Sequence, residues 1–345
     1  MPALGVLTGG GDCPGLNGAI RAIVRGALAR GFDVVGIRQG FRGLAIGETV
    51  PLDRQAVAGI LPRGGTILGT SSYDCFREER GVELVVEATR LLELDGVVAI
   101  GGEGTLGIAH RLFTEHGYPV VGVPKTIDND IAGTDVTIGF DTAVHICTEA
   151  IDRLHSTAES HNRVMVVEVM GRNTGWIAAA AGIAGGADVI LVPEVPTAIE
   201  DVADHIMRRH EDGKDFSIVV VAEGYQLTRR SGEREAPVVQ EFDEYGYARL
   251  GGVARVVADE IEQLIGFDTR VTVLGHVQRG GTPTARDRFL ATRLGLRAAE
   301  LAGRGEWGRM AAVRGNEIVD VPLAEATAAR RDVPPAWIEA GRVVA

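Results

Sequence analysis

Residues 4–30 read LGVLTGGGDCPGLNGAIRAIVRGALAR, in which a short apolar run is followed by a glycine-rich turn and then by a segment of helical period. The apolar run is Leu4–Leu7 and the helical segment is Leu16–Arg30. Similar apolar runs recur along the chain, and each is followed by glycine, proline or polar residues. They are Leu4–Leu7, Val34–Ile37, Gly96–Ile100, Val120–Val123, Val164–Val169, Asp188–Val192, Ser217–Val221 and Val271–Leu274. Apolar strands that alternate with helices, of which Val82–Leu94 is another, predict an α/β fold with mainly parallel sheets covered on both faces.

The composition limits the function classes. A chain of 345 residues predicts about two domains, and 47 glycines with only 5% aromatic residues suit many tight strand-to-helix turns. The net charge of −12 argues against a nucleic-acid or membrane partner, since such surfaces repel an acidic protein. The cysteines Cys13, Cys75 and Cys147 have no metal-binding spacing and leave one thiol unpaired. Without a signal sequence or an apolar run of membrane length, the chain is expected to be soluble and cytoplasmic.

Glycine-rich motifs follow the first and third apolar runs. Thr8–Gly15 reads TGGGDCPG and lies between a strand and a helix, where backbone amides can form a nest for phosphate oxygens. Gly101–Thr105 reads GGEGT, in which the glycines admit a phosphate chain and Glu103 offers an oxygen ligand for Mg²⁺. Either motif can also be a structural turn without a ligand. Together they indicate a phosphate-binding site but do not identify the acceptor.

A third motif places carboxylates beside these glycines. Pro124–Asp130 reads PKTIDND and follows the strand Val120–Val123. Asp128 and Asp130 repel each other, so each is expected to raise the pKa of the other. One of them can then accept a proton from a sugar hydroxyl that attacks phosphorus. An ordinary Asx turn is the structural alternative.

Basic residues near strand ends form the fourth signal, because arginine forks fix the orientation of a sugar phosphate. The arginines are Arg163, Arg172, Arg270 and Arg279, and Glu223 and His276 lie just past strands where they can hold sugar hydroxyls. The stretch Tyr225–Gly252 is the most polar, and it is expected to be an irregular, solvated excursion without chemistry.

These motifs together resemble the phosphofructokinase family from the first strand to about residue 330. The matching segments are GVLTGGGDCPGLNGAIR, RGGTILGT, GGEGT, PKTIDNDI, TIGFDTA, SHNRVMVVEVMGR and VTVLGHVQRGGTP, in family order. The resemblance implies two similar three-layer α/β domains with the active site in the cleft between them. It implies a donor-binding domain of residues 1–139 with about 279–325, and a sugar-phosphate domain of residues 140–278 with about 326–345.

The resemblance also implies a reaction, transfer of a phosphoryl group from ATP with Mg²⁺ to the 1-hydroxyl of fructose 6-phosphate in glycolysis. Asp128 would be the proton acceptor, supported by Thr126, Asp130 and Arg172. The implied donor-binding residues are Gly10, Gly102, Glu103, Gly104, Thr105 and Lys125, with Glu103 also holding the metal. The implied sugar-phosphate residues are Thr126, Ile127, Asp128, Arg163, Met170, Gly171, Arg172, Glu223, Arg270, His276, Val277, Gln278 and Arg279. Arg163 and Arg270 match positions that reach a neighbouring subunit, so a homodimer or homotetramer is expected.

The phosphoryl donor depends on two positions that disagree. Pyrophosphate-dependent members of the family carry Asp where this chain has Gly104, and Lys where it has Lys125, whereas ATP-dependent members have glycine at both. We give Gly104 more weight, because an Asp there would repel the α-phosphate of ATP. ATP is therefore the expected donor and pyrophosphate is the alternative.

The chain departs from the family after Gly69-Thr70, where many members have an arginine that bridges donor and acceptor phosphates. This chain has Ser72 there, and Asp74 adds a negative charge nearby. Arg77 or Lys125 then substitutes for it, or the enzyme is slow, or its substrate differs, for example sedoheptulose 7-phosphate. A catalytically inactive subunit is a further alternative. An NAD kinase or lipid kinase would share GGEGT but neither PKTIDND nor GHVQRGG.

Overall fold

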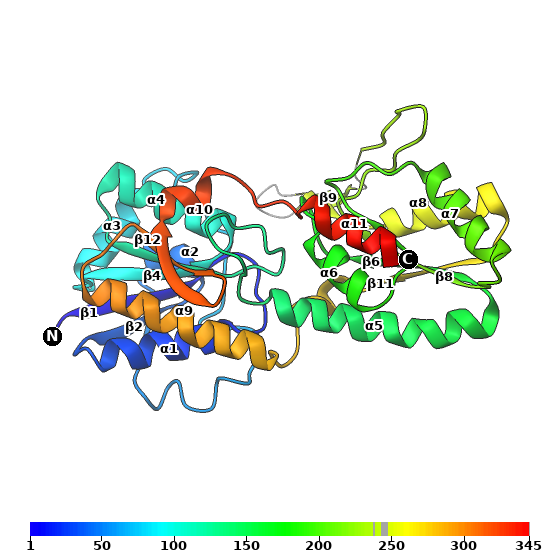
Figure 1. The fold of residues 1–345 in the computed structure, drawn as a ribbon. Coiled ribbons are helices and arrows are strands. Elements are labelled where there is room, and N and C mark those ends of the chain that lie inside the picture. The colour runs from blue at the N-terminus through cyan, green and yellow to red at the C-terminus, as the bar shows by residue number, and fades with distance from the viewer. Residues whose placement is uncertain (237–238, 243–247, 345) are drawn as a thin grey trace. The chain divides into compact units, whose positions relative to one another are not determined.

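The computed structural model describes residues 1–236, 239–242 and 248–344 (Figure 1). Over these residues the chain forms two compact units, and each is described by itself. Unit 1 comprises Met1–Thr142 and Arg279–Arg331, and unit 2 comprises Ala143–Gln278 and Asp332–Ala345. The last passage between the units comes after Arg331, whereas the sequence analysis placed it near residue 325.

Unit 1 contains a sheet whose central strands are all parallel. Its order is β13-β12-β5-β4-β1-β2-β3, and the outer strands β13 and β3 are antiparallel to their neighbours. The strands are β1 (Ala3–Thr8), β2 (Asp33–Ile37), β3 (Thr49–Pro51), β4 (Gly96–Gly101), β5 (Val120–Pro124), β12 (Arg309–Arg314) and β13 (Glu317–Pro322). Every residue of β4 and β5 is buried, which explains their continuous apolar sequences.

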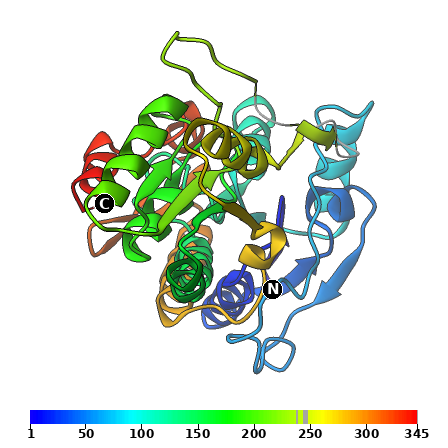
Figure 2. The same cartoon turned by 90° about the vertical axis from the view of Figure 1, so that its right-hand side faces the viewer.

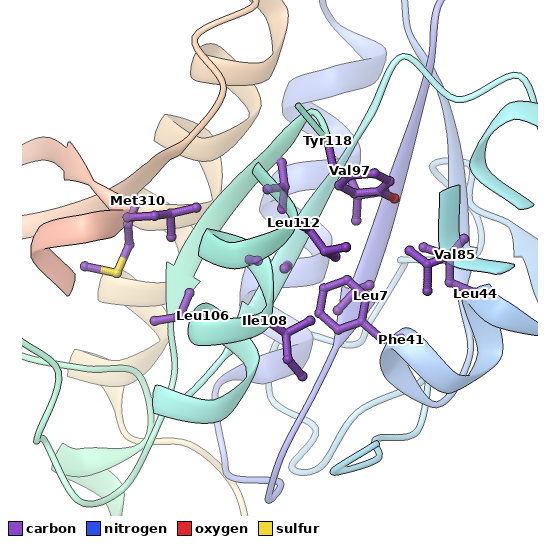
Figure 3. Packing of buried hydrophobic residues seen from close by; sticks show 14 of the residues in the cluster. Leu7, Phe41, Leu44, Val85, Val97, Leu106, Ile108, Leu112, Tyr118 and Met310 are labelled. Carbon is purple, nitrogen blue, oxygen red and sulfur yellow. The ribbon is translucent and has the colours of Figure 1, made fainter. Parts of the chain in front are cut away.

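Helices cover both faces of this sheet. Helices α1 (Leu16–Leu28) and α9 (Ala285–Gly303) lie side by side on one face (Figure 1). The other face carries α2 (Gly40–Ala45), α3 (Gly81–Leu91), α4 (Glu103–His116) and α10 (Leu323–Ala328). The core between these helices and the sheet includes Leu7, Phe41 and Leu112 (Figure 3). Tyr118 is in the same core, and its hydroxyl is 2.7 Å from that of Thr89, so its buried polar atom has a partner.

Unit 2 contains a parallel sheet of order β11-β6-β8-β7. Its strands are β6 (Val164–Val169), β7 (Val189–Leu191), β8 (Ser217–Ala222) and β11 (Thr269–Val273). Its helices are α5 (Phe140–His161), seen end-on in Figure 2, α6 (Trp176–Ala184), α7 (Ile199–Glu211), α8 (Val253–Ile265) and α11 (Pro335–Val344), with a 3₁₀ turn η1 at Gly275–Arg279. The buried carboxylate of Glu168 accepts hydrogen bonds from the amides of Gly252 and Ala254, which fixes the start of α8.

The structure corrects several boundaries. The first helix ends at Leu28 instead of Arg30, and the predicted helix Val82–Leu94 is Gly81–Leu91. The strand expected at Val271–Leu274 is β11, Thr269–Val273, so Arg270 is inside the strand. Helix ends are set by capping and tertiary contacts that apolar periodicity does not record.

The expectation of an irregular, solvated stretch at Tyr225–Gly252 is confirmed for residues 230–236, which are exposed and belong to no named helix or strand, but it is wrong for other described parts of the stretch. Tyr225 and Leu227 are buried, and the Tyr225 hydroxyl donates to the carbonyl of Thr197 at 2.6 Å. Strands β9 (Val239–Phe242) and β10 (Ala248–Leu250) pair antiparallel within it. Arg229 forms a forked ion pair with Glu260, so charges that suggested a solvated loop are paired with a helix. Residues 237–238 and 243–247 of this stretch lie outside the described residues.

Cys13, Cys75 and Cys147 are free and fully buried. In the described part of the chain, none of the helices has the length and apolar character needed to cross a bilayer. Nor do the described residues contain a group of three or more His, Cys, Asp or Glu side chains arranged to hold a metal ion by themselves.

Candidate active site

The motifs of unit 1 follow the neighbouring strands β1, β4 and β5. Parallel strands end at one edge of a sheet, so the loops after Thr8, Gly101 and Pro124 lie together at that edge. The loops also bond to one another. The Gly9 amide donates to the Ile100 carbonyl at 2.9 Å, and the Lys125 amide donates to the Gly101 carbonyl at 2.9 Å.

The turn after β1 is packed closely against side chains from other segments of unit 1. A Cβ at Gly9 would be 2.5 Å from Oγ1 of Thr105, and a Cβ at Gly11 would be 2.1 Å from Nη1 of Arg279. Arg279 donates from Nη1 to the carbonyl of Asp12 at 3.3 Å. Its buried Nε has no hydrogen-bond partner among the described residues. The structure therefore groups Arg279 with the glycine-rich turn of unit 1, where a cationic donor suits a bound phosphate.

Lys125 lies beneath this turn and is only 2% exposed. Its ammonium donates to the carbonyl of Gly9 at 3.0 Å and also to that of Gly11. Burial lowers the pKa of Lys125, because the charged form loses hydration. The side chain fixes the backbone of the turn and brings positive charge to within 3.8 Å of a Cβ built at Gly10.

The GGEGT loop forms the N-terminus of α4. Gly102 is the N-cap and no side chain caps it, so the first amides of the helix are available to an anion. Thr105 is buried, whereas Glu103 is exposed. A Cβ built at Gly104 meets no atom of the described residues within 4 Å, so these residues leave the space beside Gly104 open.

The PKTIDND loop is held in place by Thr137. The Thr137 hydroxyl donates to the Thr126 carbonyl at 2.6 Å, and its amide donates to Oδ1 of the buried Asn129 at 3.0 Å. Asn129 has a positive φ of 53°, a left-handed conformation that Asn tolerates. The amide of Asp128 donates to the Thr126 hydroxyl at 3.1 Å, and the Asp128 side chain is partly exposed. Ile127 is buried, so its side chain anchors the loop in the core.

Asp130 has an unusual environment. Burial raises its pKa to about 7, with a smaller contribution from the charge of Asp128. The repulsion by Asp128 is predictable from the sequence, whereas the larger effect of burial is not. Arg330 lies 3.5 Å from Glu103 and 3.9 Å from Asp130. These carboxylates suit Mg²⁺, which proteins typically bind through one or two carboxylates together with substrate phosphates.

In unit 2, Met170, Gly171 and Arg172 follow β6, and Glu223 follows β8. The Glu223 amide donates to the Val169 carbonyl at 2.9 Å, and the Gly224 amide donates to the Gly171 carbonyl at 3.1 Å. The two loops therefore share one edge of this sheet. Gly171 has a φ of 140°, and a Cβ there would be 2.5 Å from the Thr174 carbonyl oxygen. Arg172 is exposed beside it.

The turn η1 after β11 lies at the same edge and contains His276, Val277 and Gln278. His276 and Val277 are exposed, whereas Gln278 is fully buried. Oε1 of Gln278 accepts from the Met170 amide at 3.1 Å, and Nε2 donates to the Gly275 carbonyl at 3.0 Å. The Gln278 side chain thus links the β6 loop to η1, and both of its polar atoms are occupied within the protein.

Arg163 and Arg270 lie at the opposite end of the same strands. Arg163 precedes β6 and Arg270 is the second residue of β11, so both are at the amino ends. Arg163 donates from Nε to Asp268 at 2.6 Å, and Arg270 forms an ion pair with the same carboxylate. The structure separates these arginines from Arg172 by the length of a strand.

The segment that lacks the family arginine also makes local contacts. Ser72 is partly buried, and Nε of Arg77 lies 3.5 Å from Asp74. The carbonyl of the preceding Ser71 accepts from the Gly10 amide at 2.9 Å. This segment therefore contacts the glycine-rich turn through its backbone.

Sequence reasoning missed Arg330, Asp268 and Asp287. The fully buried Asp287 accepts hydrogen bonds from the Gly139 amide and the Thr142 amide at 2.9 Å each. None of the three has a recognisable motif around it, because each acts on a segment more than 100 residues away.

A family model and two relatives from curated proteins all connect this chain with phosphofructokinases. The family model described as Phosphofructokinase matches residues 3–302. A protein of Streptomyces coelicolor named pyrophosphate–fructose 6-phosphate 1-phosphotransferase is 54% identical over 337 residues, covering 97% of each chain. A second protein of the same organism, named ATP-dependent 6-phosphofructokinase 3, is 51% identical and covers 96% of this chain and 97% of its own.

A solved structure agrees with these relationships. Phosphofructokinase from Saccharomyces cerevisiae superposes with a TM-score of 0.81 at 34% identity, over 95% of this chain. The chain described here spans 45% of the length of that yeast chain.

Proposed function

The chain belongs to the phosphofructokinase family and is a phosphotransferase that acts on fructose 6-phosphate; from this premise, we propose that its phosphoryl donor is ATP. The observation that carries the proposal is the open space beside Gly104 at the start of α4. A carboxylate at this position would meet the α-phosphate of a nucleotide, and glycine leaves both the volume and the charge free.

Unit 1 supplies the groups for the donor and for proton transfer. The amides of the glycine-rich turn and of the α4 N-terminus bind the donor phosphates, and Lys125 holds the turn in shape. Asp128 accepts the proton of the sugar 1-hydroxyl as that oxygen attacks the terminal phosphorus. Mg²⁺, held by Glu103, supplies charge neutralisation on the transferred group when it is bound.

Unit 2 supplies the groups for the acceptor. Arg172 binds the 6-phosphate through its fork of donors, and Glu223 and His276 hold sugar hydroxyls. Gln278 positions this loop through the Met170 amide and does not need to contact the sugar. Met170 and Gly171 shape the pocket wall from the same loop.

Pyrophosphate is the second candidate donor. Lys125 matches the lysine of pyrophosphate-dependent members of the family, and some relatives are named as pyrophosphate-dependent. Proteins about equally similar to this chain have names with either donor, even within Streptomyces coelicolor. Lys125 adds charge that either donor can use, but its ammonium is bound to the carbonyls of Gly9 and Gly11. It therefore acts mainly on the shape of the turn, and Gly104 remains the position that discriminates.

The test compares kcat/KM for ATP and for pyrophosphate, with fructose 6-phosphate and Mg²⁺, in the same buffer. We expect ATP to be preferred at least tenfold, and Gly104→Asp to remove that preference. Gly104→Ala is the matched control, because it adds a Cβ into open space without a charge. A preference of the unmodified enzyme for pyrophosphate would overturn the donor assignment, and turnover only with sedoheptulose 7-phosphate would overturn the acceptor.

We also infer that the enzyme is a cytoplasmic homodimer or homotetramer in which Arg163 and Arg270 serve the site of a neighbouring subunit. Their location at the amino ends of β6 and β11, away from Arg172, supports this inference. Light scattering of the purified chain should give two or four times 36.5 kDa. A monomer that retains full turnover would contradict it.

A further inference from the structure

The last segment of unit 1 returns to the loop that contains the catalytic Asp128. Arg330 forms an antiparallel bridge with Ile131, and the Arg331 amide donates to the Asp130 carbonyl at 2.9 Å. Nη1 of Arg331 also donates to the Asn129 carbonyl at 3.2 Å. Backbone contacts therefore fix this segment against the loop.

This attachment directs the Arg330 side chain toward two carboxylates. Its Nη2 lies 3.5 Å from Oε2 of Glu103, and its Nε lies 3.9 Å from Oδ2 of Asp130. Glu103 comes from the start of α4, after β4, and Asp130 comes from the loop after β5. One guanidinium is thus shared between acidic groups from neighbouring strand ends.

The arrangement differs from an ordinary surface ion pair. Arg304 and Glu300, for example, pair one turn apart on α9 with both side chains in contact with solvent. The Arg330 and Glu103 side chains are 35% and 61% exposed, but the Asp130 side chain is only 10% exposed, so the charge of Asp130 is less screened by water. Both distances are longer than a good hydrogen bond, so the guanidinium offsets part of the negative charge of the pair without binding it tightly.

We propose that Arg330 is the resident counter-ion of the Glu103–Asp130 pair and that a divalent cation must displace it to bind there. The inference rests on the use of Mg²⁺ in the proposed function. Arg330 reduces the repulsion between the two carboxylates when no metal is bound. Because the positive charge of Arg330 competes with the metal, it weakens the affinity of the site for a divalent cation. Arg330 therefore sets the concentration of divalent cation at which the site fills.

The test measures binding of Mn²⁺, used as a probe for Mg²⁺, to the full chain without donor or sugar, by electron paramagnetic resonance of the free ion. Arg330→Gln removes the competing charge and should lower the Kd for Mn²⁺ at least about threefold, since a positive charge a few ångströms from the site repels the cation even when it is partly screened by water. Arg330→Lys keeps the positive charge but loses the forked guanidinium, so its Kd for Mn²⁺ should lie between those of the unmodified chain and Arg330→Gln. Arg304→Gln, which removes an exposed arginine from the far end of α9, is the matched control and should leave the Kd unchanged.

Two further measurements identify the site. Glu103→Gln in the Arg330→Gln background should abolish the gain in affinity. With fructose 6-phosphate and donor present, Arg330→Gln should lower the Mg²⁺ concentration for half-maximal rate, whereas a loss of structure would lower kcat instead. Thermal melting of each variant shows that it is folded.

Equal Mn²⁺ affinity in the unmodified chain and Arg330→Gln would overturn the inference, as would the absence of binding to both. A gain that survives Glu103→Gln would also overturn it. The unmodified chain can still phosphorylate fructose 6-phosphate in each of these cases, so failure of this inference is distinguishable from failure of the proposed function.

Discussion

At the scale of single residues, the loop Thr126–Asp130 shows what sequence can and cannot predict. The motif predicts a functional loop, because carboxylates follow a buried strand. It does not reveal that Asn129 is buried at a positive φ, or that Asp130 is largely covered. Those properties come from Thr137 and from the segment at Arg330 and Arg331, which approach from elsewhere in the chain.

Thr137→Val tests whether this support matters for turnover. The change removes the hydroxyl that donates to the Thr126 carbonyl at 2.6 Å but preserves the shape of the side chain. An unsatisfied buried carbonyl should lower the free energy of unfolding by about 1–3 kcal/mol. The shift of the loop should lower kcat about tenfold, since small misplacements of catalytic groups are costly. Urea unfolding and steady-state kinetics measure the two effects.

The control for this prediction is Thr134→Val. The Thr134 hydroxyl is similarly buried, but it contacts the Val136 carbonyl and the Val313 amide instead of Thr126. This variant should lose comparable stability and retain its turnover. Equal kcat values for the two variants would show that Thr137 has only a structural role.

At the scale of elements, the starts of α5 and α9 cap each other. Asp287, in the first turn of α9, accepts from the Gly139 and Thr142 amides and from the Thr142 hydroxyl. Thr284 caps α9 and also donates to Asp141 at 2.6 Å. Burial raises the pKa of Asp287, but these hydrogen bonds favour its charged form.

Asp287→Asn should therefore destabilise unit 1. An amide retains one acceptor and places its NH₂ donors against the Gly139 or Thr142 donors. We expect the free energy of unfolding to fall by about 2–4 kcal/mol, because a buried acceptor with several charge-assisted bonds is lost. Chemical denaturation measures the change. Asp53→Asn is the control, since among the described residues Asp53 accepts a hydrogen bond only from the Ala56 amide, in an exposed turn; a similar loss there would contradict the prediction.

Element prediction from the sequence succeeds where the pattern is local. The strands β1, β4, β5, β6 and β8 are continuous apolar runs, and the sequence places them to within one residue at each end. Strands β12 and β13 were not predicted. The sequence of β13, EIVDVP, mixes polar residues into an outer strand that is only partly buried, so it has no apolar run to detect. The hydrogen bond from the Gly252 amide to Glu168, at the start of α8, could not be predicted either, because it joins residues more than 80 positions apart.

At the scale of the whole molecule, burial of the three cysteines predicts that their thiols react slowly in the folded protein. Cys13, Cys75 and Cys147 are each 0% exposed. Burial raises the pKa of Cys13 and of Cys75 to about 12, so neither forms the reactive thiolate near neutral pH. A thiol reagent such as DTNB should label none of them in the folded protein within minutes, and all three after denaturation. Rapid labelling of the folded protein would contradict the described burial.

The motif order along the whole chain predicted the family, and the structure describes how each unit organises its share of the motifs. Gly10, Gly102 and Asp128 belong to strand ends of unit 1, and Arg172 and Glu223 belong to strand ends of unit 2. Arg279, whose assignment to the sugar-phosphate site stays a prediction, contacts the glycine-rich turn. That contact could not be predicted, because its partner Asp12 lies 267 positions away.

The measurement that tests the account most directly is the turnover of Asp128→Asn with fructose 6-phosphate and saturating Mg-ATP. Removing the proposed proton acceptor should lower kcat at least about a hundredfold while KM for the sugar changes little, since general-base catalysis contributes about 10²–10⁴-fold. The exposed Asp53→Asn should retain the kcat of the unmodified enzyme. A decrease of less than tenfold in a folded Asp128→Asn protein would mean that another group accepts the proton, and the central assignment would be wrong.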